Sequence, residues 1–492
     1  MLFPEFKSIY NYLTNLAYGN GVASEFYATL EVPKEMKDEN VSAQEYIETW
    51  LLQINYPEVD IRINNNGSAT VVDFVQNRFL LTVYDESFID NVQSPYNYTW
   101  KIYLQCKAGM VNSPDIYEFN FYLGKERGQT TLNKKYDWVK CNRDFNGFYV
   151  NNYDPADYEK IIDTLRSHPE SFSIGDRANL IHVAYTLAFR GSLSYNTAAY
   201  LSSYLADHET DYVPWRVFFW HMNKLSQILE HRPVFNTLRK YGLSLAKSLA
   251  ENIDLWNDNG NHTERLLKIN MIEFLCRMQD ASCLRNATSL YETVPVEYFT
   301  SPVENAQNNT IAPNFRQPVY RFHIQNTYDY LDWFNLNELY LSTIDPSERA
   351  TVVSALSYSR LLWIVDIYLS ELLEEKSRIR PQDFFDVISF IGRNPSGRHV
   401  AWAFIRQNWN VIVSKFGNSR ALNRAIKNIC ESFDNVFLLE EVLMFFDTTP
   451  AGSGAMFRFQ TIEIIANNIF WVADHEKDLE NAFFTPNKNF NY

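Results

Sequence analysis

The spacing of hydrophobic residues divides the chain into three stretches of different character. Up to about residue 51, apolar side chains recur every three or four positions, as at Ile9, Tyr12, Leu13 and Leu16, which predicts short amphipathic helices. Residues 52–153 contain short runs of β-branched and aromatic residues between Asn-, Gly- and Pro-rich turns, which predicts a small β-sandwich. The expected strands are 59–63, 69–75, 79–83, 98–104, 117–123 and 137–141.

Residues 154–492 return to the helical period and keep it almost throughout. Helices of about ten to twenty residues alternate with short polar loops. Three apolar stripes comprise Leu267, Met271, Phe274, Leu275 and Met278; Ile405, Trp409, Ile412 and Phe416; and Ile426, Ile429, Cys430 and Phe433. So long a run of helices favours a large all-α superhelical array of the HEAT or armadillo type, with a compact bundle as the alternative. The expected fold class is multidomain α+β, with domains at 1–51, 52–153 and 154–492.

Composition and charge narrow the classes of partner. The 492 residues include 59 acidic and 44 Lys or Arg side chains, which gives a formal net charge of −15, and no basic stripe offsets it. We therefore expect no nucleic-acid binding. No apolar run approaches the ~18 residues that span a bilayer, and the N-terminal residues lack the pattern of a signal peptide. Six sequons are glycosylation candidates if the chain enters a secretory lumen: Asn40, Asn66, Asn97, Asn261, Asn286 and Asn308.

Five ordered segments carry a family resemblance that covers essentially the whole chain. They are Trp-Leu-Leu-Gln-Ile-Asn-Tyr-Pro at 50–57, Gly-Phe-Tyr-Val-Asn-Asn-Tyr-Asp at 147–154, Arg-Ala-Asn-Leu-Ile-His-Val-Ala-Tyr-Thr-Leu-Ala at 177–188, Asp-Tyr-Val-Pro-Trp at 211–215 and Asn-Ile-Phe-Trp-Val at 468–472. In content and order they resemble the C-terminal region of M1-family zinc aminopeptidases of the aminopeptidase N type. That region comprises the end of the catalytic domain, a β-sandwich domain and a C-terminal helical domain. By this resemblance, the chain is expected to be truncated downstream of the zinc site.

The catalytic motifs of that family are absent from this sequence. A zincin needs two His one helical turn apart with a Glu between them, whereas the His-Glu pairs at 208–209 and 475–476 have no second His at that spacing. The family's Gly-Ala-Met-Glu-Asn loop is missing too, because Gly-Ala-Met at 454–456 continues without the acid. The resemblance also implies that the catalytic Tyr precedes residue 1. We expect no catalytic residue, metal ligand or cofactor in this chain, and zinc only in the complete family enzyme.

Two arginines are the candidate binding residues. Arg420 and Arg424 are four residues apart, so they share one face of an expected helix. By the resemblance, this part of the helical domain faces the chamber that holds the peptide, where two guanidinium groups suit a carboxylate. The alternative is a solvated basic face.

The five cysteines and two departures from the family have separate interpretations. Cys276 and Cys283 resemble a family disulfide. Two further family cysteines would fall at Arg321 and Tyr358, which is consistent with one absent disulfide. Cys106 and Cys141 lie on or beside expected strands, where they either pair or remain free buried thiols. Cys430 lies on an apolar stripe and fits a core position.

The resemblance implies a function that belongs to a larger enzyme. The chain would shape and cover the peptide chamber, and alone it would be non-catalytic and peptide-binding or structural. One alternative is an independent helical-repeat interaction scaffold, and another is a truncated gene model or isoform of an active aminopeptidase. Expected partners are peptides, the missing catalytic domain and a second copy through the helical domain. The family implies a plasma-membrane ectodomain, extracellular or lumenal location. Truncation also predicts an apolar patch on residues 1–50.

Overall fold

The computed structural model describes residues 7–82 and 93–484, and the chain divides into two compact units. The first unit comprises residues 1–221 with 481–492, and the second comprises residues 222–480. The predicted strand at 79–83 ends outside the described residues. The predicted domain ranges 52–153 and 154–492 differ from this division, and they stay predictions.

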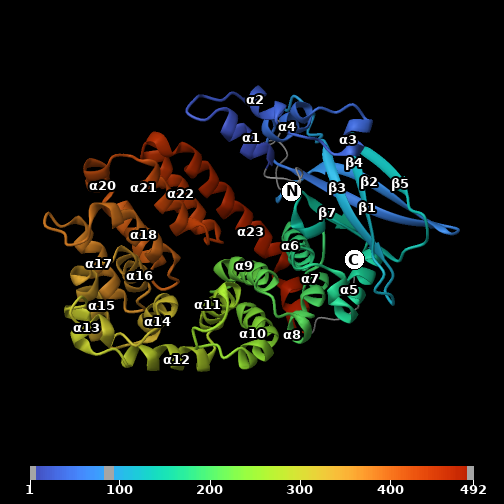
Figure 1. Cartoon of the computed structure of the whole chain (residues 1–492). Helices are drawn as coiled ribbons and strands as arrows, with labels where there is room; N and C mark the ends of the chain where they lie inside the picture. The colour runs from blue at the N-terminus through green and yellow to red at the C-terminus, as the bar shows by residue number, and fades with distance from the viewer. Residues whose placement is uncertain (1–6, 83–92, 485–492) are drawn as a thin grey trace. The chain divides into compact units, whose positions relative to one another are not determined.

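The first unit begins with four short helices (Figure 1). They are α1 (Lys7–Asn15), α2 (Ala23–Ala28), α3 (Lys34–Asp38) and α4 (Ala43–Leu51). Ser42 caps α4 by accepting a hydrogen bond from the Glu45 amide, and the Glu45 carboxylate accepts one from the Ser42 amide in return. Trp50 anchors the end of α4 because its indole N–H donates to the Lys101 carbonyl at 3.0 Å.

The lead helices expose several large apolar side chains, while the predicted apolar patch on residues 1–50 stays a prediction. Large hydrophobic side chains on and beside α1 and α2 are exposed, and they include Ile9, Tyr10, Leu13, Tyr18 and Val22. A contiguous apolar patch formed by such side chains would be uncommon on a protein surface that meets only water.

The β-sandwich forms as predicted, from two sheets whose strands pair mostly in antiparallel fashion. Sheet order is β5-β2-β1-β7 in one sheet and β4-β3-β6 in the other. The strands are β1 (Pro57–Asn66), β2 (Ala69–Arg78), β3 (Ile102–Gly109), β4 (Tyr117–Leu123), β5 (Arg127–Thr131), β6 (Trp138–Cys141) and β7 (Val150–Tyr153). Phe74 on β2 stacks on Phe121 of β4 with ring centroids 4.9 Å apart, so the two inner faces share a core.

Two of the predicted strands are wrong in position, for local reasons. The run 98–104 becomes a strand only from Ile102, because Asn97 and Tyr98 have positive φ values of 51° and 52°, which an extended strand does not allow. Residue Phe79 does not start a strand of its own. It follows directly on β2, and its ring stacks on Tyr56 at 5.1 Å.

Helices make up the rest of both units. In the first unit, α5 (Pro155–Ser167) packs on β6 and α6 (Ile174–Arg190) packs on β7. The following helices of that unit are α7 (Tyr195–Ser202) and α8 (Leu205–His208), and α9 (Tyr212–Leu229) crosses the division between the units. Ser173 and Gly191 define the ends of α6, through a side-chain cap and a left-handed C-terminal residue with φ of 86°.

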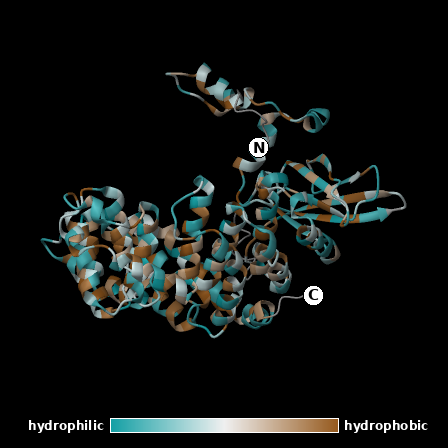
Figure 2. Ribbon diagram, turned by 60° about the horizontal axis from the view of Figure 1, so that its bottom comes forward, coloured by the Kyte–Doolittle hydropathy of each residue, from teal (hydrophilic) through white to brown (hydrophobic). Residues whose placement is uncertain are grey.

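The second unit consists of helices that pack pairwise along the chain (Figure 1). Hydrophobic residues gather between its packed helices, while polar residues lie on outward turns (Figure 2). Its helices are α10 (Phe235–Asn252), α11 (His262–Arg277), α12 (Ala281–Glu292), α13 (Val296–Thr300), α14 (Pro313–Asn326), α15 (Tyr330–Ser342), α16 (Pro346–Leu356), α17 (Leu362–Leu373), α18 (Phe384–Arg393), α19 (Arg398–Gln407), α20 (Trp409–Phe416), α21 (Arg420–Cys430), α22 (Val436–Thr448) and α23 (Ala455–Phe484), the last of which crosses the division again.

The predicted apolar stripes lie in the helical cores, with one difference. All five residues of the stripe that begins at Leu267 are buried, and so are the four that begin at Ile426. The stripe from Ile405 to Phe416 is shared by two helices, α19 and α20, because the chain breaks the helix at Asn408. The chain is therefore a mixed α+β protein with a helical C-terminal part.

Candidate functional site

The two His-Glu pairs do not fit a zinc site. Glu209 is buried, and its carboxylate accepts hydrogen bonds from Arg177 at 2.7 Å and from the Tyr204 hydroxyl at 2.8 Å, while His208 is exposed. Glu476 is held by Arg232 at 3.1 Å. Within residues 7–82 and 93–484, no group of three His, Cys, Asp or Glu side chains is placed to hold a metal ion. Both glutamates serve as structural ion-pair partners.

The two predicted binding arginines lie on one exposed face of α21. Arg420 begins the helix after the Ser419 cap and Arg424 follows one turn later. Both are exposed, whereas the opposite face of the helix is buried. The Arg424 guanidinium lies 5.8 Å from the centroid of the Phe457 ring. In the described part of the chain neither arginine forms an ion pair within 4.0 Å, so both groups are available to an anion.

A cavity of about 310 Å³ lies in the first unit, between α4, β3 and the loop before β7. Its wall is mainly aromatic and amide, with Trp50, Tyr103, Phe148 and Gln105 among the lining residues. Arg143 also lines it, but the guanidinium is paired with the Glu118 carboxylate. The cavity therefore suits binding of an apolar group rather than acid–base chemistry.

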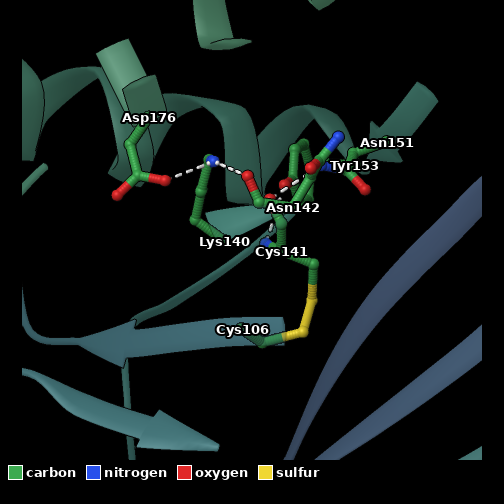
Figure 3. The surroundings of a disulfide bond; sticks show 7 residues. All are labelled: Cys106, Lys140, Cys141, Asn142, Asn151, Tyr153 and Asp176. Carbon is green, nitrogen blue, oxygen red and sulfur yellow. Dashed lines mark hydrogen bonds and ion pairs between the residues drawn. A yellow bond between two sulfur atoms is a disulfide. The ribbon is translucent and has the colours of Figure 1, made fainter. Parts of the chain in front are cut away.

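A buried ionic cluster joins the sandwich to α6, and sequence reasoning missed it. Asp176 accepts a hydrogen bond from the Lys140 ammonium at 2.7 Å (Figure 3). It also pairs with the Lys107 ammonium at 2.9 Å. The side chains of Lys140 and Asp176 have no exposed surface. Lys140 also donates to the Asn142 carbonyl at 2.7 Å, and the Asp144 amide donates to Asp176 at 2.8 Å. The sequence marks Asp176 only as part of a capping box with Ser173, which does not indicate its lysine partners.

The cluster shifts the ionisation of its members. Burial lowers the pKa of Lys140 to about 8, although the Asp176 carboxylate opposes this effect. Burial by itself would raise the pKa of Asp176, but the ammonium groups of Lys140 and Lys107 outweigh it and hold that pKa well below its usual range. The group that stabilises this junction is therefore an ionised Asp176.

Four of the five cysteines form disulfides. Cys276 and Cys283 pair across the turn between α11 and α12, as the family resemblance implied. Cys106 and Cys141 pair between the directly opposite positions of β3 and β6, which settles the open alternative in favour of a bond (Figure 3). Cys430 is a free, buried thiol in α21.

The sequons differ in how freely the Asn side chain is presented. Asn40, Asn97 and Asn286 are exposed, the first two in left-handed turns and the third on α12. Asn261 is exposed and caps α11 through its carbonyl oxygen, which leaves the amide nitrogen for a glycan. Asn308 is half-buried, and its amide donates to Asn305 at 3.2 Å. Asn66 ends β1.

Secretion of this chain behind an added signal peptide should give a glycoprotein. We expect removal of N-glycans to lower the mass, and Asn97→Gln and Asn286→Gln each to remove one glycan, because both side chains are exposed. Asn308→Gln should change the mass least. Mass spectrometry before and after glycosidase treatment measures this, with chain made in the cytosol as control. If glycosidase treatment left the mass of the secreted chain unchanged, the chain would carry no N-glycans and the prediction would be wrong.

Comparison with known proteins gives a consistent family. Residues 138–467 match the family described as the ERAP1-like C-terminal domain. The chain is 30% identical to the glutamyl aminopeptidase of Bos taurus over 483 residues, which cover 97% of this chain and 47% of the relative. It is also 30% identical to the Homo sapiens glutamyl aminopeptidase over 485 residues, which cover 97% of this chain and 47% of that protein. Endoplasmic reticulum aminopeptidase 1 of Homo sapiens is 26% identical over 449 residues, which cover 88% of this chain and 44% of that protein.

The chain thus spans about half the length of the curated relatives it matches. In the described residues no helix is long and apolar enough to cross a membrane. The family match covers most of the sandwich-to-helix junction and the helical region, and the relatives extend it over nearly the whole sequence. The chain belongs to the ERAP1-like C-terminal domain family and is an M1 aminopeptidase C-terminal region.

Proposed function

We propose that this chain is the part of an M1-type aminopeptidase that shapes and covers the peptide chamber, and that by itself it binds peptide without cleaving it. The observation that carries the proposal is the pair of exposed guanidinium groups at Arg420 and Arg424, which have no acidic partner within 4.0 Å among the described residues. A HEAT-like superhelical curvature of the helical region belongs to the same proposal.

The position of the two arginines suits a carboxylate. Both project from the first turns of α21, where the positive end of the helix dipole adds to their charge. Arg424 is further oriented by its contact with Phe457. Two guanidinium groups one turn apart can each donate two parallel hydrogen bonds to carboxylate oxygens. The ligand would be a peptide that presents a free carboxylate to this face.

Binding of the peptide should weaken when the two charges are removed. We expect Arg420→Gln combined with Arg424→Gln to weaken binding of a peptide with a free C-terminal carboxylate at least about tenfold, since two charge-assisted contacts disappear. Isothermal titration calorimetry with the 492-residue chain measures the dissociation constant. An amidated peptide should bind the unmodified chain about as weakly as the free peptide binds the variant.

Lys240→Gln is the matched control for this test. Lys240 is an exposed cation on α10 and should leave affinity unchanged. Equal affinity of the free peptide for the unmodified chain and the arginine variant would refute the proposed role. Turnover of an aminoacyl substrate by the pure chain with added zinc would refute the non-catalytic part.

Location and assembly belong to the proposal as well. Two disulfides support an extracellular or lumenal location, because such bonds persist in oxidising compartments. The exposed apolar residues on α1 and between α1 and α2 support contact with a catalytic half of the family type, which would cover them. A second copy of the chain through the helical region is the other partner that we propose.

A further inference from the structure

Arg321 and Arg277 form a pair of like charges inside the second unit. Arg321 lies on α14 and is 7% exposed, and Arg277 ends α11 and is half-buried. The two helices pack on each other. The guanidinium groups are near enough for burial and the charge of Arg321 to lower the pKa of Arg277. Guanidinium groups stay protonated in proteins, so this site carries two positive charges.

In the described residues, no carboxylate forms an ion pair with either arginine. Across the described ranges, neither Arg277 nor Arg321 has a carboxylate within 4.0 Å, and the Arg321 Nε–H is buried without any hydrogen-bond acceptor. Glu230, whose charge acts on Arg277, is already bound by Arg398 at 2.5 Å. Glu273 also acts on Arg277 and lies one turn before it on α11, but it forms no ion pair in this conformation.

Aromatic contacts orient Arg321 without satisfying its donors. Its guanidinium stacks over the Tyr358 ring, 3.8 Å from the centroid, and lies 5.1 Å from the centroid of Phe322. Stacking occupies a face of the planar group and leaves the N–H bonds at its edge. An aromatic ring also compensates only a small part of the cost of removing a cation from water. The edge donors therefore need an anion.

We propose that Arg277 and Arg321 form a binding site for a compact oxyanion, a carboxylate or phosphate group. The planar fork of a guanidinium matches two oxygens of such a group. The near-complete burial of Arg321 restricts access to a small group. Because Arg277 and Arg321 lie on different helices, an anion between them would also hold α11 against α14. This inference is independent of the proposed function.

The test is the thermal unfolding midpoint of the 492-residue chain titrated with inorganic phosphate or acetate at constant ionic strength, which is kept with sodium chloride. We expect a saturable rise for the unmodified chain. Arg321→Gln and Arg277→Gln should each weaken phosphate binding at least about tenfold by calorimetry. Without phosphate, Arg277→Gln should unfold no earlier than the unmodified chain, because it removes like-charge repulsion. No saturable rise, or the same rise in both variants, would overturn the site.

Two further variants make the result specific. Glu273→Gln removes an acid whose charge acts on Arg277 from the same helix, so it should tighten phosphate binding. Arg285→Gln removes an exposed cation on neighbouring α12 and should change nothing. If Arg321→Gln fails to fold, Arg277→Gln and Glu273→Gln still test the site, because the first should weaken phosphate binding and the second should tighten it. A short peptide with one Glu, compared with its Gln form, shows whether the oxyanion is free or peptide-borne.

Discussion

Asp176→Asn is expected to destabilise the first unit by about 3–5 kcal/mol at neutral pH, the range seen when one member of a buried ion pair is removed. The substitution keeps the size of the side chain but removes its charge. Lys140, with no exposed surface, and Lys107, with 11%, would then face each other without a counter-charge. Urea unfolding followed by tryptophan fluorescence measures the change in the free energy of unfolding.

The pH dependence of this variant has a definite sign. The pKa of Lys140 is about 8 in the folded chain and 10.5 ordinarily, so the unfolded state binds more protons between these values. Stability contributed by Lys140 therefore rises with pH through that window. Removing the Asp176 carboxylate lowers the folded-state pKa of Lys140 further. The free energy of unfolding of the variant should therefore begin to rise at a lower pH than that of the unmodified chain. A loss that stays constant from pH 7 to 9.5 would contradict this account.

Two controls separate burial from charge. Asp38→Asn breaks the exposed pair with Lys34 and should have no measurable effect. Lys140→Met leaves Asp176 bound to Lys107, so it should cost less than Asp176→Asn. The double variant Lys140→Met with Asp176→Asn should cost less than the sum of the two, because the residues are in direct contact. Additive costs would show that the ion pair is not the cause.

The sequence predicted those parts of the fold that depend on hydrophobic spacing. Strand β4 lies at the predicted residues 117–123, and β1 and β2 flank the predicted turn, where Gly67 has φ of 62°. Strands β5 and β7 were not predicted. Their sequences, Arg-Gly-Gln-Thr-Thr and Val-Asn-Asn-Tyr, have few apolar residues and become strands by pairing with β2 and β1. Tertiary pairing overrides local propensity at such positions.

The same limit applies to the candidate sites. The exposed pair on α21 could be predicted, because a four-residue spacing places two side chains on one helix face. The contact of Lys140 with Asp176 could not, since 36 residues separate them and charged residues are rarely fully buried. Arg321 and Tyr358 are notable in the sequence only as positions where the family has cysteines. Nothing in the sequence indicates that the two side chains stack at 3.8 Å.

Loss of the Cys106–Cys141 disulfide is the second large effect that we expect. The bond closes a loop with a sequence separation of 35, and the chain-entropy estimate for such a loop is about 4 kcal/mol. It links β3, which carries Lys107, to β6, which carries Lys140, so both cations of the ionic cluster are on the strands that it joins. Replacing both cysteines by Ala should therefore lower the urea midpoint of the first unit strongly.

The second disulfide provides the matched comparison. Cys276→Ala with Cys283→Ala opens a loop with a separation of only 7, for which the same estimate is about 2.5 kcal/mol, and the loss should fall on the second unit. Reductant should lower the first-unit midpoint of the unmodified chain to that of the Cys106→Ala, Cys141→Ala variant, and its second-unit midpoint to that of the Cys276→Ala, Cys283→Ala variant. In each variant, reductant should not change the midpoint of the unit that already lacks its disulfide. If reductant does not shift the first-unit transition, the bond contributes nothing to stability, and the junction depends on Asp176 with its two lysines.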